Sequence, residues 1–113
     1  MIIFEHNAIN SDTTVIEFKA LENEQEYGKC ILVLHNSIAE VTFVNYDENN
    51  SFIVEGLLKA AYNYAANRSY YIGRCSAENI DFALHKLGFY TAENGYENDI
   101  PSILMGSCKN CGK

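Results

Sequence analysis

The hydrophobic period of the chain changes near Asn50, and this change limits the fold more than any other feature of the sequence. Up to Tyr46 the apolar residues are mostly β-branched or aromatic, and clusters of turn-forming residues separate them, which is typical of strands. After Asn50 the apolar residues recur three and four positions apart, as they do on one face of a helix. The sequence therefore predicts a strand-rich first half and a second half in which helices alternate with strands.

The predicted elements follow the order β-β-β-β-α-β-α-β-β. The strands are expected at about 2–7, 14–21, 29–34, 38–46, 70–74, 89–92 and 103–105. The first helix is expected at 51–67 with a cap on Asn50 or Ser51, and the second follows a cap on Ser76 and ends at Gly88. A strand, helix, strand succession implies a parallel pair within an otherwise antiparallel sheet. The fold class is thus α/β (α+β), with a mixed central sheet of six to seven strands and two main helices.

The length and composition of the chain allow one hydrophobic core. Of the 113 residues 48% are hydrophobic, and eight tyrosines and six phenylalanines supply enough buried surface for a fold without disulfide staples. We therefore expect one domain over residues 1–106 and a flexible tail over 107–113 that carries two of the four cysteines.

The charge of the chain and the length of its apolar runs disfavour two classes of partner. The formal net charge is −7, so the surface would repel the phosphates of a nucleic acid. The longest apolar runs fall far short of the roughly 20 residues that span a membrane, and residues 1–5 show no signal-peptide pattern. We therefore expect a cytoplasmic protein with free thiols and with no nucleic-acid or membrane partner.

Residues 39–105 resemble the superfamily of GNAT (GCN5-related N-acetyltransferase) enzymes. Val44 falls on the valine of the family's bulged strand, and residues 49–54 occupy its cofactor loop. The pair Leu57 and Leu58 matches the leucines that open the following helix, and residues 86–89, Lys-Leu-Gly-Phe, match the family's final helix motif. Residues 103–105 look like the closing strand. Because no helical pattern precedes Ser51, the resemblance implies a GNAT-like sheet that lacks the usual N-terminal helices and leaves the acceptor side open.

The resemblance also implies acetyl-CoA or coenzyme A as a cofactor. Strand residues 43–45 would pair with the pantetheine amide, the backbone N–H of Val44 would polarise the thioester carbonyl, and the helix N-terminus at 51–54 would hold the pyrophosphate. The cofactor-binding residues expected on this basis are Phe43, Val44, Asn45, Asn49, Asn50, Ser51, Phe52, Ile53, Val54 and Asn79. The chain departs from the family where Phe52 and Val54 replace the loop glycines, and where Leu84 replaces the tyrosine that often acts as general acid.

Two residues are candidates for catalysis. Cys75 follows the strand 70–74, near the expected opening between two parallel strands, where a lowered pKa would make it a nucleophile or acyl carrier. Glu40, on the strand before the bulge, resembles the glutamates that act as general bases in several GNAT enzymes. The alternatives are a buried structural cysteine and a solvated glutamate.

The C-terminal residues Cys108 and Cys111 have the spacing of half a zinc site. Four ligands are required, and an intrachain site with Cys75 is disfavoured because the tail is expected to leave the sheet near Tyr70, at the other end of the strand 70–74. A site completed by another chain, a redox-active dithiol and an inert tail are the alternatives. Three functions therefore remain open. The chain is a GNAT-type N-acyltransferase or acyl-CoA binder with direct transfer to an unknown amine, a catalytically silent GNAT-like module that binds a protein partner or a second copy, or a domain whose tail has a metal or thiol function.

Overall fold

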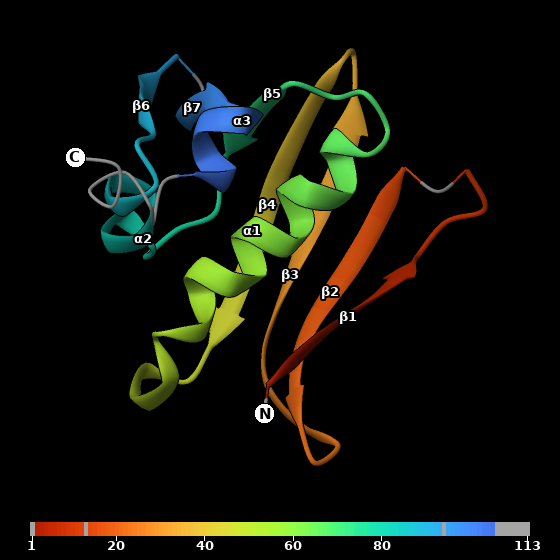
Figure 1. The fold of residues 1–113 in the computed structure, drawn as a ribbon, viewed down its shortest axis with the longest axis vertical. Coiled ribbons are helices and arrows are strands. Elements are labelled where there is room, and N and C mark those ends of the chain that lie inside the picture. The colour runs from red at the N-terminus through yellow and green to blue at the C-terminus, as the bar shows by residue number, and fades with distance from the viewer. Residues whose placement is uncertain (1, 13, 94, 106–113) are drawn as a thin grey trace.

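The computed structural model of the protein describes residues 2–12, 14–93 and 95–105, and these build a seven-stranded sheet in the order β1-β2-β3-β4-β5-β7-β6 (Figure 1). The elements, in chain order, are β1 (Ile3–Ala8), β2 (Val15–Glu22), β3 (Gln25–His35), β4 (Ile38–Tyr46), the 3₁₀ turn η1 (Glu48–Asn50), α1 (Ile53–Ala66), β5 (Ile72–Cys75), α2 (Asp81–Lys86), β6 (Tyr90–Ala92), β7 (Gly95–Asp99) and α3 (Ile100–Leu104). The α+β class with a mixed sheet is confirmed.

The sheet combines an antiparallel meander with one parallel pair. Strands β1 to β4 pair in sequence as antiparallel neighbours, and β4 pairs with β5 in parallel through the crossover helix α1. Strand β7 then runs antiparallel to β5, and β6 forms the far edge. The parallel pair predicted from the strand, helix, strand succession is thus confirmed, because the crossover returns the chain to the same sheet edge in the same direction.

Helix α1 packs its apolar stripe against β2, β3 and β4, and α3 lies beside it on the same face of the sheet (Figure 1). The buried stripe has the spacing of a helix face and consists of Ile53, Val54, Leu57, Leu58, Ala61, Tyr62, Tyr64 and Ala65. The predicted cap on Asn50 or Ser51 is wrong. Asp47 caps η1 by accepting a bond from the backbone N–H of Asn49, so α1 starts later, after Phe52, without a side-chain cap.

Two predictions for the second half of the chain are also wrong. Ile103 and Leu104 belong to helix α3 and Met105 is its C-cap, because Asp99 accepts a bond from the backbone N–H of Ser102 and Pro101 occupies the first turn, a strong helix-start pattern. The closing strand is β7 instead, which pairs with β5. The second helix starts at Asp81 and not after Ser76, because Asn79 takes a left-handed conformation (φ 67°) and interrupts the helix.

The two faces of the sheet differ in how deeply their side chains are buried. Side chains that face α1 along β2 to β5, such as Phe18, Leu32 and Val41, are fully or almost fully buried. The alternate side chains, such as Glu17, Val33 and Glu40, are half-buried. Within the described ranges no α-helix precedes α1, and the helices that pack extensively against the strands, α1 and α3, lie on the same face (Figure 1). We call the opposite face the open face. The predicted lack of N-terminal helices is confirmed.

Candidate functional site

Strands β4 and β5 separate halfway along β4. Their pairing runs from Ile38 and Ile72 to Val41 and Cys75, and the backbone N–H of Ser76 donates the last bond to the carbonyl of Val41 at 3.0 Å. Beyond that point β4 continues to Tyr46 without β5 beside it. The two strands therefore open like a fork at the carboxyl end of β5, a position at which open α/β sheets bind ligands.

A β-bulge in β4 accompanies this separation. On β3, Leu32 pairs with Val41 and its neighbour Ile31 pairs with Phe43, which leaves Thr42 without a partner. The resemblance placed the bulge at Val44, so the register moves it two residues toward the N-terminus. An unpaired residue bends its strand and increases the local twist, and this bend accounts for the departure of β4 from β5.

Two adjoining cavities occupy the fork, and we call them together the β4–β5 groove. The inner cavity, of about 310 Å³, is lined by Thr42, Phe43, Val44, Ser76, Glu78 and Asn79. The outer cavity, of about 480 Å³, is lined by Val44, Asn45, Tyr46, Glu48, Glu78 and Asn79. The hydroxyl of Tyr46 donates to the carbonyl of Asn79 at 3.1 Å, which ties β4 to the loop between β5 and α2. The groove thus runs along the second half of β4 toward η1 and the start of α1.

Four of the ten residues expected to bind a cofactor line this groove, namely Phe43, Val44, Asn45 and Asn79. Asn50 lines a separate cavity of about 310 Å³ beside residues 25–28. Asn49, Ser51, Phe52, Ile53 and Val54 line neither part of the groove. The side chains of Ile53 and Val54 point into the core, and Phe52 is 66% exposed, so Phe52 does not plug the groove.

Sequence reasoning missed five residues of the groove: Thr42, Tyr46, Glu48, Ser76 and Glu78. Ser76 was interpreted only as a helix cap, although it directly follows the strand at the expected opening. Glu48 and Glu78 place two carboxylates along the outer cavity, and no hydrophobic pattern marks such residues. These carboxylates oppose an anionic ligand at that end of the groove.

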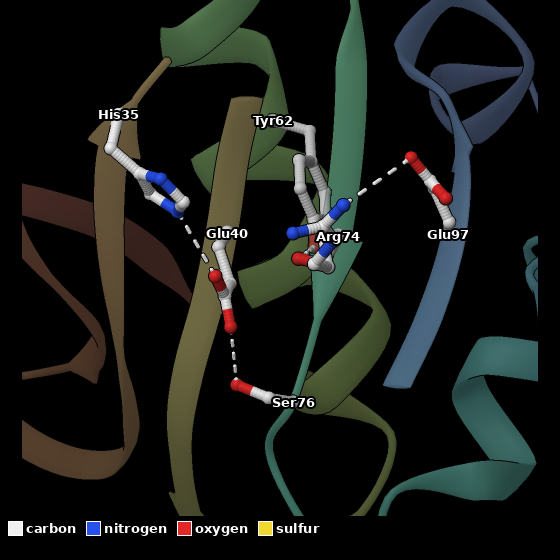
Figure 2. A network of polar contacts seen from close by, with 6 residues as sticks. All are labelled: His35, Glu40, Tyr62, Arg74, Ser76 and Glu97. Carbon is white, nitrogen blue, oxygen red and sulfur yellow. Dashed lines mark hydrogen bonds and ion pairs between the residues drawn. The ribbon is translucent and has the colours of Figure 1, made fainter. Parts of the chain in front are cut away.

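Glu40 lies on the open face, in the middle of a chain of polar contacts (Figure 2). Its Oε1 is 3.0 Å from Nε2 of His35 on β3, and its Oε2 accepts a hydrogen bond of 2.7 Å from the Ser76 hydroxyl. His35 and Glu40 lie close because the tight turn at Asn36 and Ser37, both with positive φ, joins their strands. Both carboxylate oxygens of Glu40 therefore have a fixed partner.

Arg74 extends this network across β5. It is the register partner of Glu40 on one side and of Glu97 on the other, and its guanidinium lies 3.8 Å from the Glu97 carboxylate. From the opposite face, the buried hydroxyl of Tyr62 donates to the carbonyl of Arg74 at 2.7 Å. Nε of Arg74 is buried and has no hydrogen-bond partner among the described residues. A cationic group thus lies next to the Glu40 carboxylate.

These contacts lower the pKa of Glu40. Partial burial acts to raise the pKa, but the hydrogen bonds from Ser76 and His35 and the charges of His35 and Arg74 outweigh it. The carboxylate is therefore ionised at neutral pH.

The lowered pKa predicts how acid affects stability. The stabilisation from ionised Glu40 is fully present above the unfolded pKa and is lost as the pH falls through the folded value. We expect Glu40→Gln to be less stable than the wild type at about pH 6, and the difference to shrink as the pH falls below roughly 4. Urea unfolding at a series of pH values measures it, and an unchanged difference from pH 6 to pH 3 would contradict the assignment.

The Cys75 side chain faces away from the groove. It is fully buried in the core beneath α1, on the opposite side of β5 from Arg74. Burial, together with the charges of Glu40 and Asp81, raises the pKa of the Cys75 thiol to about 11, although a backbone hydrogen bond from Ala77 acts the other way. A buried, protonated thiol favours the structural interpretation of this residue over the nucleophilic one.

The proposed metal ligands Cys108 and Cys111 lie outside the described residues. Inside the described ranges, no group of three or more His, Cys, Asp or Glu side chains is arranged to hold a metal ion. In the same ranges no helix has the length and apolar character needed to cross a membrane.

Solved structures share this architecture, whereas no protein-family model and no curated protein sequence matches the chain. A candidate acyl-CoA N-acyltransferase from Klebsiella pneumoniae has a TM-score of 0.71 at 15% identity, over 88% of this chain and 98% of the other. The candidate N-acetyl transferase YhhK from E. coli, solved bound to coenzyme A, has a TM-score of 0.68 at 13% identity, with coverage of 88% and 98%.

A third solved structure shares this fold with a lower TM-score. The PaiA N-acetyltransferase from Thermoplasma acidophilum, solved in complex with coenzyme A, has a TM-score of 0.63 at 17% identity, over 77% of this chain and 60% of the other. At such identities the likeness shows a shared fold and not a shared substrate.

Proposed function

We propose that this chain, which has the GNAT fold, binds an acyl-CoA such as acetyl-CoA in the β4–β5 groove and transfers its acyl group to an amine. The observation that carries the proposal is the fork between β4 and β5, where the groove begins beside Ser76 and follows β4 toward α1. The volumes of the two cavities fall within the range of roughly 300–1,000 Å³ that is typical of small-molecule pockets. Two of the solved structures with this fold are complexes with coenzyme A.

The second half of β4 would hold the pantetheine arm. On its β5 side the backbone of residues 43–45 pairs with no strand of the described chain, so its N–H and C=O groups are available to a ligand amide. The thioester would then lie at the inner end of the groove, where a backbone N–H such as that of Val44 would stabilise charge on the carbonyl oxygen. The phosphates would extend past Tyr46 toward the N-terminus of α1.

Glu40 is the proton acceptor in this proposal. It is ionised, it lies on the open face, and one hydrogen bond links it to Ser76 in the groove wall. In direct transfer, Glu40 would take the proton of the attacking amine, itself or through a water. The uncovered face beside it leaves room for a large or flexible acceptor.

A thermal melt with acetyl-CoA tests the proposal. A ligand at about 100 times its dissociation constant stabilises the native state by about 2.7 kcal/mol, which raises the midpoint of a domain of this size by roughly 10 °C. We expect such a shift in the wild type. Glu78→Trp, which fills both cavities from an exposed position, should abolish the shift, whereas Glu5→Trp, on the distant strand β1, should leave it intact.

A catalytically silent module that binds a protein partner or a second copy is the second candidate. The observation that favours it is the pair of carboxylates, Glu48 and Glu78, in the outer cavity, because they would repel the cofactor phosphates. If acetyl-CoA at millimolar concentration leaves the wild-type midpoint unchanged, the acyl-CoA proposal is wrong and this second candidate replaces it.

A further inference from the structure

Ser76, Glu40 and His35 form a chain of hydrogen bonds at the inner end of the groove (Figure 2). The Ser76 hydroxyl donates to Glu40 at 2.7 Å, and the other oxygen of Glu40 is held by His35 at 3.0 Å. A hydroxyl bonded to a base that a third group orients is the arrangement by which proteins activate a nucleophile.

Ser76 lies at the point where β4 and β5 separate and lines the inner cavity, where the thioester of the proposed function would lie. Its backbone N–H is fixed by the last bond between β4 and β5, at 3.0 Å from the Val41 carbonyl. Its side chain is exposed and lines the inner cavity with Thr42 and Val44. Side chains alternate between the two faces of a sheet, so Ser76, which follows the buried Cys75, points to the open face, where its hydroxyl reaches Glu40.

We propose that Ser76 accepts the acyl group from a bound acyl-CoA and carries it as an ester. The inference rests on the proposed function, because the donor is the thioester in the β4–β5 groove. The Ser76 oxygen attacks the thioester carbon while its proton passes to Oε2 of Glu40. A C–O bond forms, the C–S bond breaks, and the coenzyme A thiolate takes the proton from Glu40.

A second step returns Ser76 to its free form. An amine or water, reaching the ester from the open face, attacks the same carbon and gives its proton to Glu40. The C–O bond to Ser76 breaks, and Glu40 returns the proton to the serine oxygen. His35 touches no reacting atom in either step, so it acts as a positioning residue that keeps Oε2 of Glu40 directed at Ser76.

The test is to incubate the full chain with acetyl-CoA, quench in acid and measure the intact mass and the peptide map. We expect one acetyl group on the peptide that contains Ser76, sensitive to hydroxylamine as an ester is. Ser76→Ala should abolish this adduct, and Glu40→Gln should slow its formation by about a hundredfold, the usual range for loss of a general base. If the ester is consumed too quickly to be detected, the rate at which coenzyme A is released, measured by chromatography, reports the same step.

Two controls separate this inference from acyl-CoA binding itself. The thermal shift with acetyl-CoA should persist in Ser76→Ala, whose side chain is exposed, and Ser102→Ala on α3 should behave as the wild type throughout. A thermal shift without any Ser76 adduct, with coenzyme A released equally by wild type and Ser76→Ala, would overturn the serine ester and leave direct transfer in place. An adduct on lysine or Cys75 would overturn it as well. No thermal shift would remove both proposals.

Discussion

Gly95→Ala is expected to destabilise the fold by about 3 kcal/mol, the combined size of backbone strain and overpacking at a site that cannot relax. Gly95 opens β7 with φ +130°, a conformation that L side chains rarely adopt. A Cβ there would also lie 2.5 Å from the backbone carbonyl oxygen of Cys75. Urea unfolding followed by far-UV circular dichroism would measure the loss.

Gly56→Ala is the matched control, because a Cβ at that position also meets a close neighbour. The neighbour is the ring of Phe4, which lies on the edge strand β1 and is 37% exposed, so it can move aside. Replacing a glycine within a helix by alanine gains up to about 1 kcal/mol. We expect a change within about 1 kcal/mol for Gly56→Ala. Equal losses for the two variants would show that β7 does not approach β5 as described.

Cys75 and Cys30 are expected to react with a thiol reagent at least about a hundredfold more slowly in the folded chain than a free cysteine does. A thiol of pKa about 11 is ionised to roughly one part in a thousand at pH 8, whereas an ordinary cysteine is ionised to about a quarter. Burial, and to a smaller extent the neighbouring Cys75, raises the pKa of the Cys30 thiol as well. The two thiols are therefore inert while the chain is folded.

The measurement uses a chain with Cys108→Ser and Cys111→Ser, so that only Cys30 and Cys75 report. In guanidinium both should react at the rate of a free thiol, which supplies the control. If Cys75 in the folded chain reacts as fast as a free cysteine and acetyl-CoA protects it, then Cys75 and not Ser76 is the group that meets the acyl donor.

The secondary structure of long segments with a regular hydrophobic repeat was predictable from the sequence. The secondary structure of short segments, which depends on a single side-chain cap, was not. The alternation along 15–46 and the apolar stripe of α1 each involve many residues, so a local deviation does not change the result. The segment 100–104 contains few residues, and its helix depends on the cap from Asp99 and on Pro101. Three apolar residues at 103–105 indicate a strand only weakly, whereas Asp99 and Pro101 together strongly favour the start of a helix.

The candidate site was predictable in location but not in composition. The parting of two strands near Cys75 follows from the element order, and Glu40 lies on the strand before the bulge, but the bulge itself is at Thr42 and not at Val44. Which side of β5 a residue faces depends on where the strand pairs, and a shift of one residue exchanges Cys75 for Ser76. Glu48 begins η1 and Glu78 lies in the loop between β5 and α2, so only the folded chain brings the two residues together.

Thr42 is the single extra residue that produces the bulge in β4. Val41 faces the core before the bulge, and Val44 and Tyr46 face it afterwards, so the spacing along β4 gains one residue at Thr42. A chain without Thr42 would keep every core side chain on its present face and would form an unbroken ladder with β3. The bulge is thus encoded by the number of residues in β4, and deletion of Thr42 would remove it without changing the face on which any core side chain lies.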